Sequence, residues 1–122
     1  MNDDTMLLRQ VNPSFVQSGR VTSQVFSPTP KDENKLSCYD GDLITARLSH
    51  QHFTETLGFR STGVLGVTVK ECTDLELPSK PDPDPFPEHA VIDFEGKSKK
   101  EIERKAKELR GIATTRGYQY QP

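Results

Sequence analysis

The stretch "HAVIDFEGKSKKEIERKAKELRGIATTRG", residues 89 to 117, places a β-strand directly before a long helix. The β-branched and aromatic residues of "HAVIDF" (89–94) are typical of a strand. Ser98 and Glu101 then form the capping-box pattern that begins a helix. Apolar residues recur along one face of this helix, at Ile102, Ala106, Leu109 and Ala113. The spacing predicts a helix over 99–115.

Four further segments read as strands. Residues 64–69, "VLGVTV", form an uninterrupted apolar run, which is typical of a central strand buried on both faces. Residues 6–11, "MLLRQV", and 36–42, "LSCYDGD", predict shorter strands, the second ending in a turn. Residues 20–26, "RVTSQVF", are rich in β-branched types and follow a Ser-Gly turn.

A second helix is expected over 43–57, with Asp42 as its N-cap and Gly58 ending it. Strands and helices therefore do not alternate in βαβ units. We predict an α+β fold with a small mixed or antiparallel sheet, two helices packed on one face and many loops. The chain of 122 residues favours a single domain over 1–122.

Prolines stand at every second position from Pro81 to Pro87, with acidic residues between most of them. Each proline restricts its own φ and biases the residue before it toward extended backbone. We expect a rigid proline-rich connection at 78–88, a polyproline II rod that delivers the chain to the strand after it and blocks pairing at a sheet edge. A proline-rich ligand for a partner domain is the alternative.

The charge is distributed unevenly. The formal net charge is −2, yet residues 97–122 hold eight Lys or Arg against three Glu. A dedicated nucleic-acid-binding protein usually has a strong basic surplus, so nucleic acid is not the expected partner. The basic helix either meets an acidic protein partner or packs against the acidic remainder of the chain.

The sequence also indicates a compartment. The start, "MNDDTMLLRQ", lacks the apolar core of a signal peptide, and no apolar run is long enough to cross a membrane. We therefore expect a cytoplasmic protein whose two cysteines, Cys38 and Cys72, are reduced thiols.

Candidate site residues gather around one histidine and two polar strands. His89 follows the proline-rich segment, and its ordinary titration range suits acid–base catalysis, so we take His89 and Ser23 as candidate catalytic residues. Arg20 and Thr22, which alternate onto one side of a strand, and Ser37 are candidate ligand-binding residues, since Arg beside hydroxyls binds phosphate or carboxylate. The structural alternatives are a histidine that caps a strand and strands with one solvated face.

A covalent mechanism needs a nucleophile, a base and an orienting acid in contact. Ser23 or Ser37, together with His89 and with Asp82 or Asp84, supplies these residue types. The spacing does not show that they meet, and the G-x-S-x-G pattern is absent.

No cofactor and no metal are expected. No glycine-rich phosphate loop or dinucleotide-binding pattern occurs in the chain. His50 and His52 would project in different directions from a helix, and the two separate cysteines do not form a zinc-binding pair.

Taken in order, "GRVTSQVF", "KLSCYDGD", "GVLGVTV" and "DPDPFPEHAVIDF" resemble a set of small uncharacterised bacterial proteins. The resemblance spans most of residues 19 to 94. It implies a bacterial cytosolic origin and no particular activity. It also draws attention to Thr22, Ser23, Ser37 and His89, the polar positions of the shared pattern. Where the group usually has an apolar residue after Leu-Ser, this chain has Cys38, which fits a buried thiol.

Two functions follow from these observations. The first is a non-enzymatic protein-interaction or regulatory module, whose partner is the product of a neighbouring gene or a second copy of the chain. The alternative is a small ligand-binding protein or enzyme acting on a phosphorylated or nucleotide-like molecule. In that alternative Arg20, Thr22, Ser23 and His89 share one pocket.

Overall fold

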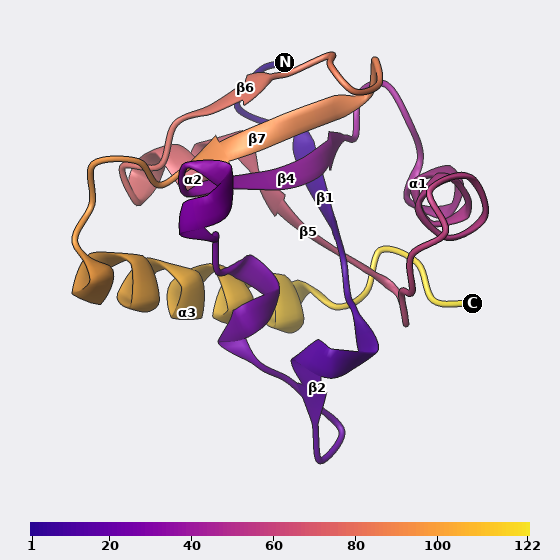
Figure 1. The fold of residues 1–122 in the computed structure, drawn as a ribbon, viewed down its shortest axis with the longest axis horizontal. Coiled ribbons are helices and arrows are strands. Elements are labelled where there is room, and N and C mark those ends of the chain that lie inside the picture. Colours follow the sequence, from indigo (N-terminus) through magenta and orange to yellow (C-terminus); the bar gives the residue numbers. More distant parts are fainter.

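A computed structural model describes residues 1–122. Its main sheet has five antiparallel strands in the order β5-β1-β4-β7-β6, and a separate hairpin pairs β2 with β3 (Figure 1). The strands are β1 Met6–Gln10, β2 Val16–Gln17, β3 Arg20–Val21, β4 Lys35–Asp40, β5 Val64–Thr68, β6 Ser79–Pro81 and β7 His89–Asp93. With the helices described next, this arrangement confirms the predicted α+β fold.

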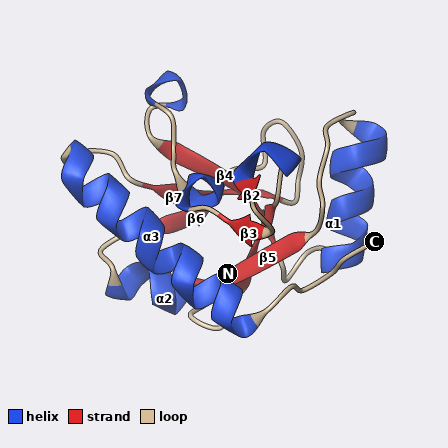
Figure 2. Ribbon diagram, turned by 90° about the horizontal axis from the view of Figure 1, so that it is seen from below, coloured by secondary structure: helices blue, strands red, loops and turns tan.

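The helices cover both faces of the sheet. They are α1 Ala46–Gln51, which continues as a π-helical turn over His52–Thr56, α2 Val69–Asp74 and α3 Lys99–Arg116. Two of them, α2 and α3, pack on one face, whereas α1 lies on the opposite side (Figure 2). The part of that opposite side not covered by α1 is where a site can form.

Local sequence explains α3. The Ser98 side chain accepts from the backbone N–H of Glu101, and the Glu101 carboxylate accepts from the backbone N–H of Ser98, so the predicted capping box is present. The apolar stripe faces the core, since Ala106, Leu109 and Ala113 are fully buried. The helix ends before Gly117, as predicted.

Alternation along β4 separates the two faces of the sheet. Leu36 and Cys38 point into the main core of 16 buried residues, which lies between the sheet and the helices α2 and α3. Ser37 and Tyr39 point to the other face. Ser37 is exposed there, whereas Tyr39 is buried in a smaller cluster with Leu8.

The expected strand over 20–26 is wrong beyond its first two residues. Only Arg20–Val21 forms a paired strand, and Ser23–Phe26 forms a 3₁₀ turn. Val25 and Phe26 are both fully buried in the main core. Because neighbouring residues in a strand point to opposite faces, only a helical turn buries both in the same core.

The expected helix start at Asp42 is also wrong. Thr45 is the N-cap, its side chain accepting from the backbone N–H of Leu48, and Asp42 instead accepts a hydrogen bond from the Thr5 hydroxyl. Residues 41–44 form the turn that follows β4, so the helix begins after them. The end of the helical segment is as predicted, since Gly58 has a φ of +75°.

Strand β5 is buried as expected but is not central. It pairs with β1 only and forms one edge of the sheet. Its other side is covered by the C-terminal tail, because the backbone of Val64 exchanges hydrogen bonds with Gln119 and Tyr120. The apolar run therefore reflects α2 and α3 on one face, α1 against the other and the tail along the edge, rather than a second neighbouring strand.

The proline-rich segment reverses the chain instead of forming a straight rod. Ser79–Pro81 is an edge strand that pairs with β7, and residues 82–88 form the loop that joins the two. The Asp84–Pro85 peptide bond is cis. This loop folds back over the face of the sheet on which Ser37 lies.

The remaining sequence-based expectations concern the cysteines and the membrane. Cys38 and Cys72 are buried free thiols. None of the helices combines the length and the apolar character that crossing a membrane requires.

Candidate functional site

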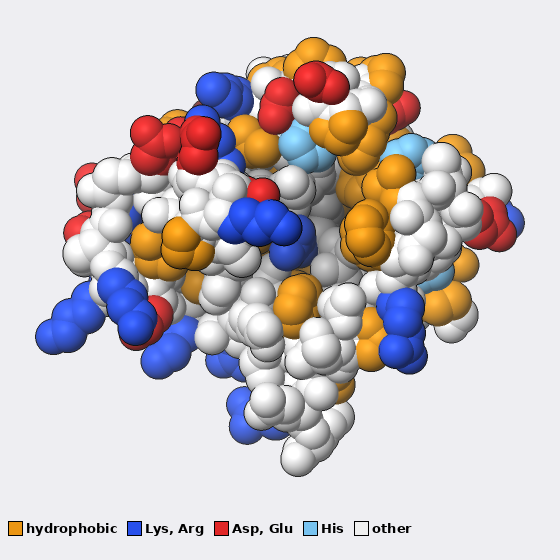
Figure 3. All heavy atoms as spheres, in the orientation of Figure 1, with side chains coloured by type: hydrophobic (Ala, Val, Ile, Leu, Met, Phe, Trp, Pro, Cys, Tyr) orange, Lys and Arg blue, Asp and Glu red, His pale blue; other side chains and the backbone are white.

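An open cleft of about 520 Å³ lies over β1, β4 and β7 on the face opposite α3. It is the hollow near the middle of Figure 3, with basic side chains on one side and hydrophobic ones on the other. The size falls in the range of small-molecule sites, about 300–1,000 Å³. Its lining residues are Leu8, Arg9, Gln10, Lys31, Asp32, Glu33, Lys35, Ser37, Cys38, Tyr39, Phe53, Leu57, Phe59, Asp82, Asp84, Pro85, Phe86, His89 and Val91.

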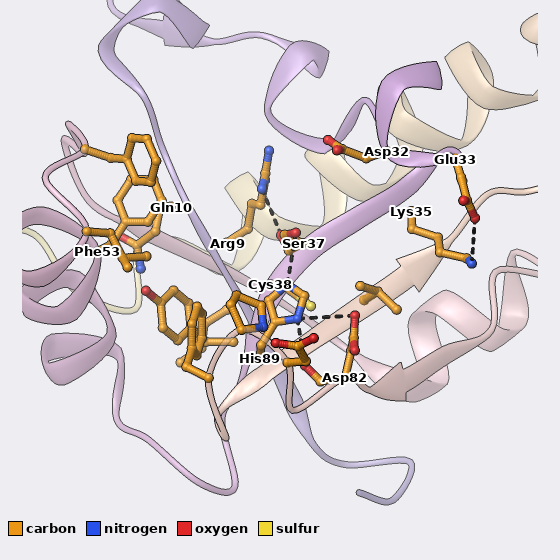
Figure 4. Close-up of a pocket in the computed structure, with 18 of the residues that line it drawn as sticks. Arg9, Gln10, Asp32, Glu33, Lys35, Ser37, Cys38, Phe53, Asp82 and His89 are labelled. Atoms are coloured by element: carbon orange, nitrogen blue, oxygen red, sulfur yellow. Dashed lines mark hydrogen bonds and ion pairs between the residues drawn. The ribbon is translucent and has the colours of Figure 1, made fainter.

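Strand register brings Ser37 and His89 together on the floor of the cleft. Ser37 is paired with Val91, and His89 stands two residues along β7 on the same face. Diagonal neighbours of this kind are within reach of a long side chain. The Ser37 Oγ and the His89 Nε2 are 3.0 Å apart, within hydrogen-bond distance (Figure 4).

The other ring nitrogen of His89 is held by Asp82. The Nδ1 atom lies 2.8 Å from the backbone carbonyl oxygen of Asp82. Because a carbonyl oxygen only accepts, Nδ1 carries the proton of the neutral ring and Nε2 presents its lone pair. The Ser37 hydroxyl therefore donates to Nε2, and this is the arrangement in which an imidazole removes a proton from a serine.

The Asp82 carboxylate stands beside the same nitrogen, with its Oδ2 atom 3.6 Å from Nδ1. This distance is too long for a direct hydrogen bond but close enough for charge attraction. If His89 takes up a proton, the carboxylate stabilises the resulting imidazolium. The attraction is reduced by water, since the Asp82 side chain is 45% exposed.

Aromatic side chains fix the position of the histidine. The Phe86 ring contacts the His89 ring edge to face, with centroids 5.2 Å apart, and stacks on Tyr39 at 5.1 Å. The Tyr39 hydroxyl shares a hydrogen bond of 2.8 Å with His52 Nδ1. Burial, and then the nearby charge of Glu88, raise the pKa of Tyr39, so this phenol stays protonated.

Arg9 brings a positive charge to the cleft. Its Nε donates to the carbonyl oxygen of Val25 at 2.7 Å, and its Nη1 donates to the carbonyl oxygen of Ser37 at 2.8 Å (Figure 4). Burial lowers the pKa of Arg9 to about 10, so the guanidinium remains charged at neutral pH.

The rim contains charges of both signs. Lys35 forms ion pairs with Glu33 at 3.3 Å and with Glu95 at 3.7 Å, so its charge is largely balanced. Lys31 and Asp32 lie on the same side of the cleft, and Asp84 lies in the loop after β6. The cleft therefore does not have the one-sided positive field that a highly charged anion prefers.

The opposite wall is apolar. Phe53, Leu57 and Phe59 line it, and the ring centroids of Phe53 and Phe59 are 5.1 Å apart. Phe59 is 57% exposed. Such a wall next to a few polar groups is the usual composition of a site for a small organic molecule.

The chemistry that this arrangement supports is proton transfer between Ser37, His89 and a bound molecule. The structure gathers no group of three or more His, Cys, Asp or Glu side chains that would hold a metal ion. Cys38 borders the cleft, but burial raises the pKa of its thiol, which makes it a poor nucleophile.

Four of the residues singled out from sequence, Ser37, Asp82, Asp84 and His89, line the cleft. Arg20, Thr22 and Ser23 do not. Arg20 lies in the β2–β3 hairpin, and the Thr22 hydroxyl donates to the carbonyl oxygen of Phe15. The structure therefore does not place these three residues in one pocket with His89.

Sequence reasoning missed Arg9 and the apolar wall. Arg9 shares a strand face with the buried residues Leu7 and Val11, and an arginine on a core-facing strand position is a signal that it has a partner. Phe53 and Phe59 gave no such signal, because a phenylalanine in or after a helix usually packs in the core.

The chain matches no protein-family model, no curated protein and no solved structure in comparisons with known proteins. The fold and the cleft together define a class: an α+β protein with an antiparallel sheet and a serine–histidine pair in an open cleft. The function is therefore argued from the cleft itself.

Proposed function

We propose that this chain is a small ligand-binding protein or enzyme that binds an organic molecule in the cleft and moves a proton through His89. The observation that carries the proposal is the hydrogen bond between Ser37 and His89 on the floor of an open cleft of about 520 Å³. A histidine with a purely structural role does not need an exposed serine in an open cavity as the partner of its Nε2 atom.

The lining indicates the ligand's chemistry. An aromatic or aliphatic part packs against Phe53 and Phe59, and a carbonyl or phosphoryl oxygen lies near Ser37 and Arg9. The sequence indicates a phosphorylated ligand on the basis of Arg20, Thr22 and Ser23, and all three residues lie outside the cleft. With charges of both signs on the rim, we favour a molecule with low net charge.

The test is a fragment screen by two-dimensional NMR on the ¹⁵N-labelled protein. We expect aromatic fragments carrying a carbonyl group to shift the amide signals of Ser37 and His89. Phe59→Ala removes part of the exposed wall, so the same fragments should bind it several-fold more weakly.

Leu48→Ala is the matched control, since Leu48 is 50% exposed and lies outside the cleft. Fragment binding should be unchanged in this variant. The proposal is wrong if no fragment shifts Ser37 and His89, or if the two variants weaken binding equally.

A protein-interaction module is the second candidate, and exposed apolar side chains near α1 favour it. Leu43 is 60% exposed, Leu48 50% and Leu57 37%. Exposed apolar residues that lie close together often mark an interface. Affinity purification from the natural host, comparing wild type with the Leu43→Ser and Leu48→Ser double variant, tests this candidate, which fails if no partner depends on these leucines.

A further inference from the structure

We propose that Ser37 is a nucleophile that attacks the carbonyl carbon of an ester bound in the cleft, with His89 as the general base and Asp82 as the residue that positions His89. This inference rests on the proposed function, because it requires the cleft to bind a small molecule. It adds a reaction class, acyl transfer, and a substrate class, esters with an apolar aromatic or aliphatic part.

The first argument is the geometry of the pair. A nucleophile and its base must be within about 2.6–3.2 Å, and Ser37 Oγ lies 3.0 Å from His89 Nε2. Ser37 is exposed in the cleft, whereas His89 is only 8% exposed. The attacking atom is therefore open to a substrate, while the base is shielded and held in place.

The second argument is the position of Asp82 behind the histidine. Its backbone carbonyl oxygen, 2.8 Å from Nδ1, selects the tautomer whose Nε2 accepts a proton. Its carboxylate, 3.6 Å from Nδ1, stabilises the imidazolium formed during attack. These are the two tasks of the acid in a serine–histidine–aspartate triad, here divided between the backbone and the side chain of one residue.

The third argument is the position of that residue in the fold. The backbone N–H of Asp82 donates to the carbonyl oxygen of His89 at 2.9 Å, so the two residues face each other across the β6–β7 hairpin. Phe86, from the loop of the same hairpin, packs on the His89 ring. One hairpin thus holds the base, its positioning residue and the ring contact that keeps the imidazole oriented.

The reaction balances with water as the only co-reactant. The Ser37 hydroxyl proton passes to His89 Nε2 as the bond from Oγ to the ester carbonyl carbon forms. The bond from that carbon to the alcohol oxygen then breaks, and the alcohol leaves with the proton from Nε2. Water, deprotonated by His89, attacks the acyl-serine, releases the carboxylic acid and restores the Ser37 hydroxyl.

The other nucleophile candidates of the chain lack one of these features. Burial raises the pKa of both thiols, that of Cys72 to about 12. Ser23 lies in the 3₁₀ turn Ser23–Phe26 and does not line the cleft. Arg9 keeps its charge and donates to the backbone carbonyl oxygen of Ser37, so a cation borders the nucleophile's strand.

The experiment uses a fluorophosphonate probe with an alkyl chain, which reacts with serines activated by a neighbouring base. We expect one adduct per chain by intact mass, mapped by peptide sequencing to Ser37, and none in Ser37→Ala. His89→Asn keeps a donor for the Asp82 carbonyl but loses the base, so labelling should slow about 100-fold or more. Ser23→Ala is the control and should be labelled as fast as wild type.

Thermal unfolding of each variant shows whether it is folded when it is labelled. The inference is overturned if folded wild type gains no adduct at Ser37, or if folded His89→Asn is labelled at the wild-type rate. If the fragment screen still shifts Ser37 and His89 in that case, the proposed binding function stands and only the nucleophile is wrong. If neither the probe nor any fragment binds, both proposals fail.

Discussion

At the scale of single residues, Glu71 shows how one side chain joins three elements. Arg116, in the last turn of α3, donates to both Glu71 carboxylate oxygens at 3.0 and 2.7 Å, and also to the carbonyl oxygen of Gly66 in β5. Glu71 also accepts from the backbone N–H of Thr68 at the start of α2. Burial would raise the pKa of Glu71, but the hydrogen bonds from Arg116 and Thr68 outweigh it and hold the pKa below its usual value.

This depressed pKa predicts how stability depends on pH. The contribution of Glu71 is present above the unfolded-state value of about 4.3 and is lost as the pH falls through the lower folded-state value. We expect Glu71→Gln to cost about 1–2 kcal/mol of unfolding free energy at pH 7. The difference from wild type should shrink between pH 5 and pH 3.

Urea unfolding at several pH values measures this difference. Glu55→Gln removes a glutamate that makes no ion pair and is the control for the loss of one carboxylate. Equal stability of Glu71→Gln and wild type at pH 7, or a loss that does not change with pH, would contradict this account.

Part of the site could be named from sequence, because alternation along a strand determines which side chains share a face. If Cys38 faces the core, Ser37 faces away from it, and this is what the structure has. The contact between Ser37 and His89 could not be predicted, because it depends on the register of β4 against β7. Arg20 and Thr22 alternate in sequence, but β3 contains only Arg20 of the two and belongs to a hairpin outside the main sheet.

At the scale of elements, four strands of the main sheet and α3 could be predicted because their signals are local. The β1, β4, β5 and β7 segments contain strand-forming residues, and α3 has both its cap and its stripe. The predictions were wrong where tertiary contacts determine the local structure or the position of a strand in the sheet. Residues 23–26 form a turn because two neighbouring side chains fill one core, and β5 is an edge strand although its sequence is apolar throughout.

Two glycines give opposite predictions at this scale. A Cβ at Gly111 in α3 would meet nothing within 4 Å, so Gly111→Ala should stabilise the protein by about 0.5–1 kcal/mol through helix propensity. A Cβ at Gly41, after β4, would collide with the carbonyl oxygen of Met6, so Gly41→Ala should destabilise it by about 1–3 kcal/mol. Urea unfolding of both variants checks the signs, and a destabilised Gly111→Ala would contradict the packing described for α3.

At the scale of the whole molecule, the basic C-terminal segment binds the body of its own chain. Lys105 donates to the carbonyl oxygen of Leu75 at the end of α2, and Arg110 donates to that of Val21. Arg116 binds Glu71. Three cationic side chains are therefore directed inward, and they attach α3 to the body of the chain.

The cleft is also a property of the whole molecule. Its floor comes from β1, β4 and β7, its apolar wall from residues 53–59, and its remaining rim from residues 31–33 and the loop 82–86. These segments are far apart in the sequence, so no local pattern predicts the cavity. It exists because α1 covers only part of the sheet face that α2 and α3 leave open.

The most direct test of the central claim is the tautomer of His89, read from a long-range ¹H–¹⁵N NMR spectrum of the neutral imidazole. The chain has three histidines, and His89→Asn assigns the signal. We predict that Nδ1 bears the proton and that Nε2 is unprotonated and accepts from Ser37. A ring protonated at Nε2, or one that exchanges between both tautomers, would contradict the claim that Asp82 holds His89 ready to accept a proton from Ser37.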